Sequence, residues 1–290
     1  MEYTDQPAWK RAVKCAISLG VFSTDQMRRT FPPIAGAAKR GRLVVLYYHS
    51  VPPAERELFA RQLDMLLRHA RPLRSDEELN CLPVGDSVAI TFDDGFENFL
   101  TQALPELEKR RIPSTVFLIA EGMNREFGSA ESSEKLLSLE QVQSLPRRLV
   151  SLGSHTLSHP LLTEIEEAVA RREIYESRVK LESILDRPVT EFSFPFGGFN
   201  QKLVAAARDA GYRRVYTTLP AFAFEDGNDF VIGRVRVDPT DWPMEFRLKL
   251  SGAYRWLPIV FSAKRWAIEA ARRIWQKPVA QSTTPRSMVR

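Results

Sequence analysis

The strongest constraint on the fold is a regular alternation of short apolar runs with longer segments of helical periodicity. Runs rich in Val, Ile, Phe and Tyr predict buried strands at Leu43–Tyr48, Val88–Phe92, Thr115–Ile119, Leu149–Leu152, Phe192–Phe194, Arg214–Thr217 and Phe230–Val237. Helical segments such as Glu55–Ala70 separate these runs. Because parallel strands need long crossover connections, the alternation predicts an α/β fold around a parallel sheet. Periodicity alone does not decide whether the sheet closes into a barrel.

Local signals predict how some of these segments begin. Ser138 with Gln141, and Thr163 with Glu166, form the capping-box pattern that starts a helix. The segment between about residues 121 and 134 shows no clear period and is interpreted as an inserted loop. These signals place helices along the chain without placing them in space.

The two ends of the chain differ in composition from its middle. We expect an amphipathic appendage and linker at 1–41, the main domain at 42–242, a basic and aromatic helical extension at 243–275, and a disordered polar tail at 276–290. Cys15 and Cys81 form no CxxC pair, which predicts reduced and unpaired thiols.

Charge and hydropathy limit the partners that we expect. The formal net charge of +5, from 41 Lys and Arg against 36 Asp and Glu, permits binding to an anionic surface without requiring it. No basic run interleaved with aromatic residues predicts binding to nucleic acid. The first residues lack the basic start of a secretory signal, and no window reaches about 18 apolar residues, so we expect a cytoplasmic protein. The extension at 243–275 either packs on the main domain as a helix or contacts an anionic membrane peripherally, on the cytoplasmic face of the inner membrane.

One polar cluster that follows a predicted strand contains two adjacent carboxylates. Asp93 and Asp94 lie in the run TFDDGF, where Gly95 allows a tight turn. Like charges this close resist joint ionisation unless a cation or a shared proton compensates. The alternative interpretation is an ordinary turn that faces solvent.

A second cluster, SHTLSHP, carries His155 and His159 just after another predicted strand. One helical turn would put imidazoles at this spacing on the same side of the chain. A single histidine is more often a structural residue, but these are two of only four in the chain. Two imidazoles and a carboxylate make up the ligand set of catalytic zinc sites that keep a position open for water. A second carboxylate would then be available as a base.

A third cluster, FSFPFGGFN, follows a further strand. The backbone around Pro195, Phe196 and Gly197 could direct amide groups at a developing oxyanion, and the alternative is a simple Gly/Pro turn into the next helix. In (β/α) barrels the active-site residues gather at the carboxyl ends of the strands, where all three clusters are expected.

The runs TFDDGF, SHTLSHP and FPFG together resemble the first three motifs of the NodB-like polysaccharide deacetylases, carbohydrate esterase family 4, over roughly residues 42–237. The resemblance implies a distorted (β/α)7 barrel and a divalent metal ion, usually Zn²⁺. It also implies that Asp93 is the general base, and that Asp94, His155 and His159 are the metal ligands.

The chain departs from the family pattern at two places. Many members have an Arg that braces the catalytic Asp where this chain has Ser193, and Arg234 is the candidate replacement. The family also has a catalytic His near its carboxyl end, but no His follows His159. The run LVVLYYHSVPP resembles the start of circularly permuted members, which makes His49 the candidate general acid. The alternative is a structural histidine after a strand.

The resemblance implies an enzyme that hydrolyses the acetamide of N-acetylated sugars in a polysaccharide or glycan and releases acetate. One alternative is removal of formyl or acetyl groups from a lipid-linked aminosugar, or the opening of a cyclic amide. Another is a carbohydrate-binding relative without catalysis. The identity of the sugar and the oligomeric state do not follow from these patterns.

Overall fold

The computed structural model describes residues 7–30, 41–77, 82–129, 132–224 and 229–260. Contacts divide the chain into two units, Met1–Arg255 and Trp256–Arg290. The predicted tail at 276–290, Cys81 and residues 261–275 of the predicted extension lie outside the described residues. The domain boundaries therefore stay predictions.

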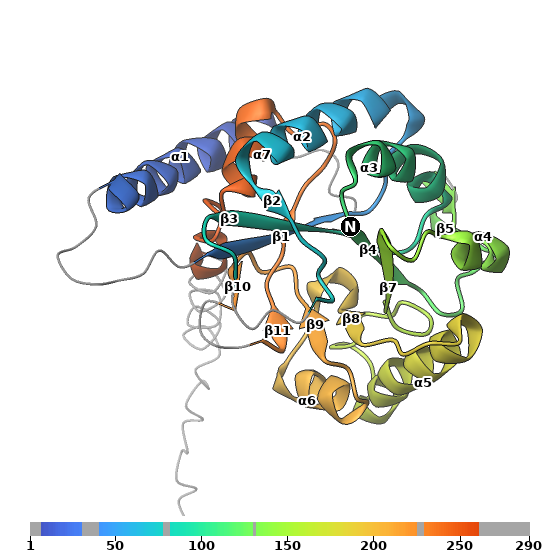
Figure 1. The fold of residues 1–290 in the computed structure, drawn as a ribbon. Coiled ribbons are helices and arrows are strands. Elements are labelled where there is room, and N and C mark those ends of the chain that lie inside the picture. The colour runs from blue at the N-terminus through green and yellow to red at the C-terminus, as the bar shows by residue number, and fades with distance from the viewer. Residues whose placement is uncertain (1–6, 31–40, 78–81, 130–131, 225–228, 261–290) are drawn as a thin grey trace, which may run out of the picture. The chain divides into compact units, whose positions relative to one another are not determined.

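The first unit is built around a parallel sheet that curls into a nearly closed barrel (Figure 1). Its strands are β1 (Arg42–Tyr48), β3 (Asp86–Phe92), β4 (Ser114–Leu118), β7 (Val150–Ser154), β8 (Glu191–Ser193), β9 (Arg214–Tyr216), β11 (Val231–Ile232) and β12 (Val235–Arg236). Neighbours follow the order β1-β3-β4-β7-β8-β9-β11, and β12 pairs with β1 in parallel. The segment β11–β12 thus pairs first with β9 and then with β1, which confirms the predicted α/β barrel.

All seven predicted strands are present, within a few residues of their predicted ends. The last one is interrupted at Gly233 and Arg234, because the chain leaves its partner β9 at Ile232 and meets β1 at Val235. Two short strands add to the sheet at its margins: β2 (Arg71–Pro72) and β10 (Phe222–Ala223).

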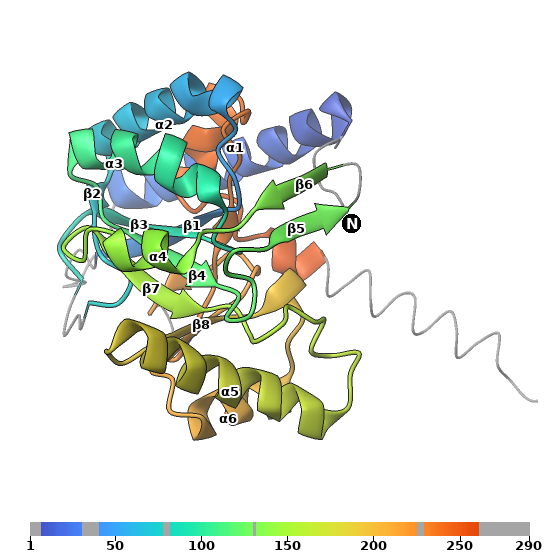
Figure 2. The ribbon, with the colours of Figure 1, turned by 90° about the vertical axis from the view of Figure 1, so that its right-hand side faces the viewer.

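Helices pack around the outside of the strands (Figures 1 and 2). They are α1 (Ala8–Thr30), α2 (Arg56–His69), α3 (Leu104–Arg110), α4 (Leu139–Ser144), α5 (Glu167–Leu185), α6 (Gln201–Asp209) and α7 (Pro243–Leu250), with short turns η1 (Pro53–Glu55), η2 (Phe99–Ala103) and η3 (Pro195–Gly197). None of the described helices is long and apolar enough to cross a bilayer.

Two local predictions are corrected and one is confirmed. The capping box of Ser138 and Gln141 is present at the start of α4. The second predicted box is wrong, because α5 begins after Glu166 and no side chain caps it. The predicted inserted loop contains a hairpin of β5 (Glu126–Ser129) and β6 (Ser132–Lys135), visible at the right of Figure 2.

Aromatic side chains fill the layer between the barrel and helices α2 and α3. Tyr48 stacks on Phe92 with ring centroids 5.4 Å apart, and Phe59 of α2 meets Tyr48 edge-on at 5.2 Å. Phe99 contacts Phe92 at 4.8 Å. Each of these four rings is buried. Burial of a Phe side chain contributes roughly 2–3 kcal/mol, so this layer holds β1 and β3 firmly against their helices.

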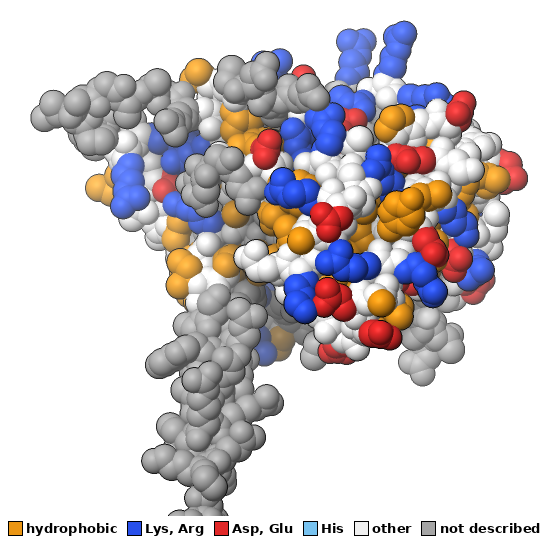
Figure 3. Space-filling model, turned by 90° about the horizontal axis from the view of Figure 1, so that it is seen from below, with side chains coloured by type: hydrophobic (Ala, Val, Ile, Leu, Met, Phe, Trp, Pro, Cys, Tyr) orange, Lys and Arg blue, Asp and Glu red, His pale blue; other side chains and the backbone are white. Residues whose placement is uncertain are grey.

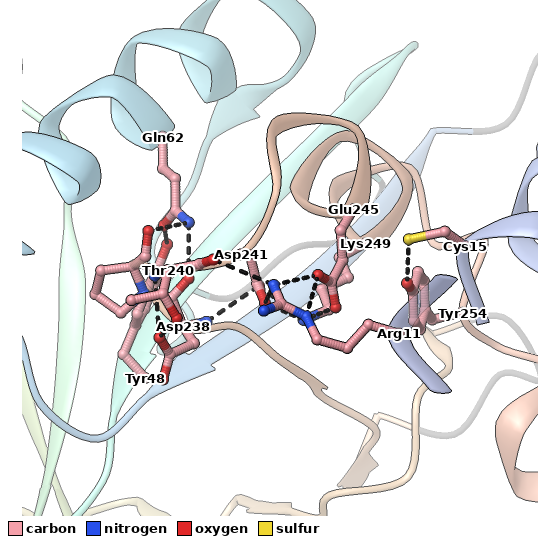
Figure 4. Close-up of polar contacts among 11 residues, drawn as sticks. Arg11, Cys15, Tyr48, Gln62, Asp238, Thr240, Asp241, Glu245, Lys249 and Tyr254 are labelled. Atoms are coloured by element: carbon pink, nitrogen blue, oxygen red, sulfur yellow. Dashed lines mark hydrogen bonds and ion pairs between the residues drawn. The ribbon is translucent and has the colours of Figure 1, made fainter. Parts of the chain in front are cut away.

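A polar network joins α1 and α7 to the loop that follows β12 (Figure 4). Arg11 donates to Glu245 at 2.7 Å and to the carbonyl oxygen of Thr240 at 3.1 Å. Lys249 donates to both oxygens of Asp241 at 2.7 Å. Helix α1 is therefore attached to the barrel by ion pairs.

Candidate metal centre

Asp93 and Asp94 follow the carboxyl end of β3 and differ in backbone conformation. Asp93 continues the pairing of β3 with β1, since its backbone N–H donates to the carbonyl oxygen of Tyr48 at 2.9 Å. Asp94 and Gly95 then take positive φ angles of 69° and 79°, which turn the chain sharply. A side chain at position 95 would meet Leu118 at 2.7 Å, so the turn needs glycine. Both carboxylates are buried.

The two histidines lie on a loop after β7, and not on the helical turn that their spacing suggested. The loop departs from helical geometry because Thr156 and His159 take positive φ angles of 68° and 66°. His155 continues the strand pairing through its backbone N–H, which donates to the carbonyl oxygen of Leu118 at 2.8 Å. The loop nevertheless brings the two imidazoles together, with ring centroids 4.8 Å apart.

Asp94, His155 and His159 converge on one point. Asp94 Oδ1 lies 3.4 Å from His155 Nε2 and 3.2 Å from His159 Nε2, and the ligand atoms of the three buried side chains all lie within 4.8 Å of one another. Asp94 Oδ1 and His159 Nδ1 have no hydrogen-bond partner among the described residues, which is costly for buried polar atoms unless another group binds there. The donor set therefore fits a divalent cation that accepts nitrogen and oxygen ligands.

The protonation of His155 also suits a metal ligand. Its Nδ1 lies 2.8 Å from the carbonyl oxygen of Ser193, which can only accept, so Nδ1 carries the proton and Nε2 keeps a lone pair. Burial lowers the pKa of His155 to about 4, although the negative charge of Asp93 opposes this shift. The ring is therefore neutral near pH 7, as metal binding requires.

Asp93 is held in a buried ion pair with Arg234. The two guanidinium nitrogens Nη1 and Nη2 lie 2.7 and 2.8 Å from the two carboxylate oxygens, a bidentate arrangement. Burial raises the pKa of Asp93, but the charge of Arg234, with a contribution from His155, outweighs burial and lowers the pKa to about 2. Asp93 is therefore ionised at neutral pH.

The remaining donors of Arg234 are satisfied inside the barrel. Nη1 also donates to Thr91 Oγ1 at 3.0 Å, and Nη2 donates to Ser193 Oγ at 2.8 Å. The guanidinium carbon lies 4.6 Å from the ring centroid of Tyr47 and 5.4 Å from that of Phe117. Arg234 thus reaches Asp93 from the last barrel segment, on the side where the small Ser193 leaves room.

His49 emerges beside Asp93 at the same end of the barrel. Strands β1 and β3 pair with Tyr48 opposite Phe92, so the next residue of each strand projects from the same edge. The charge of the His49 imidazole contributes to lowering the pKa of both Asp93 and Asp94, which reflects its proximity to these carboxylates. Its ring is half-buried and lies edge-on to Tyr47 with centroids 5.6 Å apart.

The turn Pro195–Gly197 lies against the histidine loop. Phe196 takes a positive φ of 56°, and its exposed ring meets the ring of His159 edge-on with centroids 4.6 Å apart. Pro195 has no N–H, and the N–H of Gly197 donates to the carbonyl oxygen of Phe194 at 3.1 Å. Of the three predicted oxyanion residues, Phe196 is the one whose N–H remains as a candidate donor.

Comparison with known proteins relates this arrangement to one family. Residues 83–215 match the family model described as polysaccharide deacetylase. A peptidoglycan-N-acetylglucosamine deacetylase of Bacillus cereus is 28% identical over 156 residues, which are 53% of this chain and 46% of that protein. The structure of IcaB from Ammonifex degensii matches with a TM-score of 0.64 and 26% identity, over 74% of this chain and 99% of that chain. The Streptococcus pyogenes deacetylase PplD, in complex with acetate, matches with a TM-score of 0.62 and 25% identity, over 72% and 98%.

The chain is thus similar to the polysaccharide deacetylases over residues 83–215 and in its fold. The predicted resemblance is thereby confirmed, and so is the predicted class of an enzyme that acts on linear amide bonds. Circular permutation within the polysaccharide deacetylases stays a prediction, as do the individual roles of Asp93, His49 and Arg234.

Several residues around this candidate centre carried no signal in the sequence. Glu173 of α5 accepts the backbone N–H groups of Leu157 and Ser158 at 3.0 and 2.9 Å, and so supports the histidine loop. Phe127 of the β5–β6 hairpin lies edge-on to His159 with centroids 4.9 Å apart. Only the hairpin and the helix packing, both long-range features, bring these side chains to the site.

The same hairpin also contacts the segment after His49. Ser50 Oγ donates to the carboxylate of Glu134 at 2.9 Å, and Asn98 Nδ2 donates to the same carboxylate at 2.5 Å. The hairpin therefore forms part of the wall on both sides of the candidate centre.

Proposed function

We propose that the protein is a metal-dependent deacetylase that hydrolyses the acetamide of N-acetylated sugars in a glycan and releases acetate. The observation that carries this proposal is the convergence of Asp94, His155 and His159 on one point, with the ionised carboxylate of Asp93 beside them. The names of the relatives, which act on peptidoglycan N-acetylglucosamine or hold acetate, support an N-acetyl sugar as substrate.

Asp94, His155 and His159 would hold the metal ion, and we propose Zn²⁺ because two imidazoles and one carboxylate are a common catalytic zinc set. Bound there, the ion supplies Lewis acidity and lowers the pKa of a water molecule toward neutrality.

The chain's own residues then carry the protons. Asp93, ionised by its pairing with Arg234, accepts the proton of the attacking water as oxygen bonds to the acetamide carbon. The Phe196 N–H stabilises the oxyanion that develops on the carbonyl oxygen. His49 donates a proton to the sugar nitrogen as the carbon–nitrogen bond breaks, so the products are acetate and the free amine.

The test combines metal content with acetate release from a chitooligosaccharide. Asp93→Asn should keep the metal content of the native protein and lose activity by about 100-fold or more, because the proton acceptor is removed while the three ligands are kept. Because this variant also takes the charged partner from Arg234, thermal melting should show that it is folded. His155→Ala should lose both the metal and the activity. His69→Ala, at an exposed position of α2, is the matched control and should change neither.

Two results would count against the proposal. Substantial acetate release by Asp93→Asn would remove Asp93 from the role of base. Release of formate from a formylated aminosugar, with no acetate from any acetylated sugar, would replace the proposed substrate by the formyl alternative.

A further inference from the structure

Helix α1 has an unusual distribution of polarity. On the side that faces the barrel the two buried residues, Ser18 and Asp25, are polar, and Cys15, Val21 and Phe22 beside them are half-buried. Asp25 accepts from both guanidinium nitrogens of Arg255 at 2.7 and 2.8 Å, while Arg11 pairs with Glu245 at 2.7 Å. The polar residues of α1 are therefore used in attaching it to the barrel.

The opposite side of α1 is apolar and exposed. Trp9, Val13, Ile17 and Met27 are 64%, 51%, 44% and 63% exposed. Residues four apart lie on one helix face, and residues about five turns apart return to it, so these four side chains form a single stripe. We call them the outer stripe. An amphipathic helix on a soluble domain normally has the reverse orientation, with its apolar face toward the core.

Helix α5 also exposes apolar side chains, since Tyr175 and Val179 are 57% and 48% exposed, but charged residues of both signs surround them. Seen from the side of α5 and α6, Lys and Arg are interspersed with Asp and Glu over the surface (Figure 3). Glu167 of α5, for example, pairs with Lys202 of α6 at 2.7 Å. The outer stripe differs in its longer extent and in having no exposed acidic residue on the same helix, and an apolar surface of this kind marks a contact site.

Charge indicates which partner this surface fits. The exposed charged side chains of α1 are Lys10, Arg28 and Arg29, all basic, because its one acidic residue, Asp25, is buried. A second copy of α1 would therefore present like charge. The segment 261–275 of this chain has four basic residues and one acidic residue, so it too is basic.

We propose that α1 docks this protein on a bilayer surface that contains anionic lipids. The outer stripe enters the interface between headgroups and acyl chains, with Trp9 suited to that depth, and the basic residues contact the headgroups. Salt bridges fix the helix along the barrel, since Arg11 contacts the loop after β12 and Arg29 pairs with Asp86 at the start of β3, at 2.6 Å.

The experiment is cosedimentation of the full chain with vesicles of phosphatidylcholine alone and of phosphatidylcholine mixed with phosphatidylglycerol. The native protein should bind the mixed vesicles and not the neutral ones. The variant Trp9→Ser/Val13→Ser/Ile17→Ser should lose at least about tenfold in partitioning, because most of the buried apolar area is removed. Lys10→Gln/Arg28→Gln should weaken binding to the mixed vesicles in a salt-dependent manner.

Tyr175→Ser/Val179→Ser is the matched control, since both side chains are exposed and four residues apart on α5. It should bind as the native protein does, and thermal melting should show that every variant is folded. Equal binding to both kinds of vesicle, no binding to either, or full binding by the α1 triple variant would each overturn the proposal. A dimer that the triple variant abolishes, without vesicle binding, would assign the stripe to a second copy instead.

Discussion

Arg234 has no exposure to solvent, and its charge is balanced by one residue, Asp93, in a bidentate pair. Removing one member of a buried pair leaves the other unpaired at a cost of about 3–5 kcal/mol, whereas removing both charges is often nearly neutral. Substitutions of Arg234 and Asp93, singly and together, therefore test whether this buried ion pair stabilises the barrel.

We expect Arg234→Met to lower the free energy of unfolding by about 3 kcal/mol or more, measured in urea, because Asp93 becomes an unpaired buried carboxylate. Adding Asp93→Asn to this variant should restore a large part of the loss. If the two substitutions are simply additive, the interaction that we assign to the pair is absent.

Glu191 is a buried carboxyl group at the start of β8. Tyr216 and Ser75 donate hydrogen bonds to it, with the Ser75 hydroxyl at 3.0 Å. Burial raises the pKa of Glu191 to about 7, and the hydrogen bond from Tyr216 only partly opposes this shift. In the unfolded chain the pKa of a Glu side chain is about 4.3. The stability that Glu191 contributes is thus full below about pH 4 and is lost as the pH rises through 7.

We therefore expect Glu191→Gln, which keeps the shape but cannot ionise, to gain stability over the native protein as the pH rises from 5 to 8. The relative gain should approach about 3 kcal/mol. Urea unfolding of both proteins at the two pH values measures it. A difference that stays constant with pH would show that Glu191 titrates normally.

At the scale of elements, the histidine loop depends on α5. Glu173 accepts two backbone N–H groups of this loop and also the Ser158 hydroxyl, at 2.7 Å. Glu173→Ala should weaken Zn²⁺ affinity by about 10- to 100-fold, because His159 is no longer held in position. Isothermal titration with Zn²⁺ measures the change.

Glu176→Ala is the control on the same helix, since Glu176 is exposed and pairs only weakly, at 3.9 Å, with Arg172. It should leave the affinity unchanged. A Zn²⁺ affinity of Glu173→Ala equal to that of the control would mean that the loop holds its shape without α5.

Strands were predictable from the sequence because each lies inside the barrel wall and shows a short, continuous apolar run, as in Leu43–Tyr48 and Val88–Phe92. The β5–β6 hairpin was not, since its residues are mostly polar and lack the continuous apolar run of a buried strand. The histidine loop misled the helical prediction, because two positive φ angles, at Thr156 and His159, do not show in residue spacing. Glu173 was not predicted, because the sequence pattern of α5 does not distinguish it from the other acidic residues of that helix.

At the scale of the whole molecule, the parallel barrel explains why distant segments meet. The carboxyl ends of β1, β3, β7 and β8 lie at one edge, so His49, Asp93, Asp94 and His155 come together although they span more than 100 residues. The sequence predicted this edge correctly from the position of each motif after a strand. The contact of Arg234 with Asp93 depends on how the segment β11–β12 joins β9 to β1 and closes the barrel. Sequence periodicity cannot show this closure.

The most direct test of the central claim is anomalous X-ray diffraction at the zinc edge, from crystals grown with ZnCl₂. A single strong peak should lie between Asp94 Oδ1, His155 Nε2 and His159 Nε2, at about 2.0–2.2 Å from each. The same peak should be absent from crystals of His155→Ala. Zinc bound elsewhere, or no peak between these three atoms in the native protein, would contradict the account.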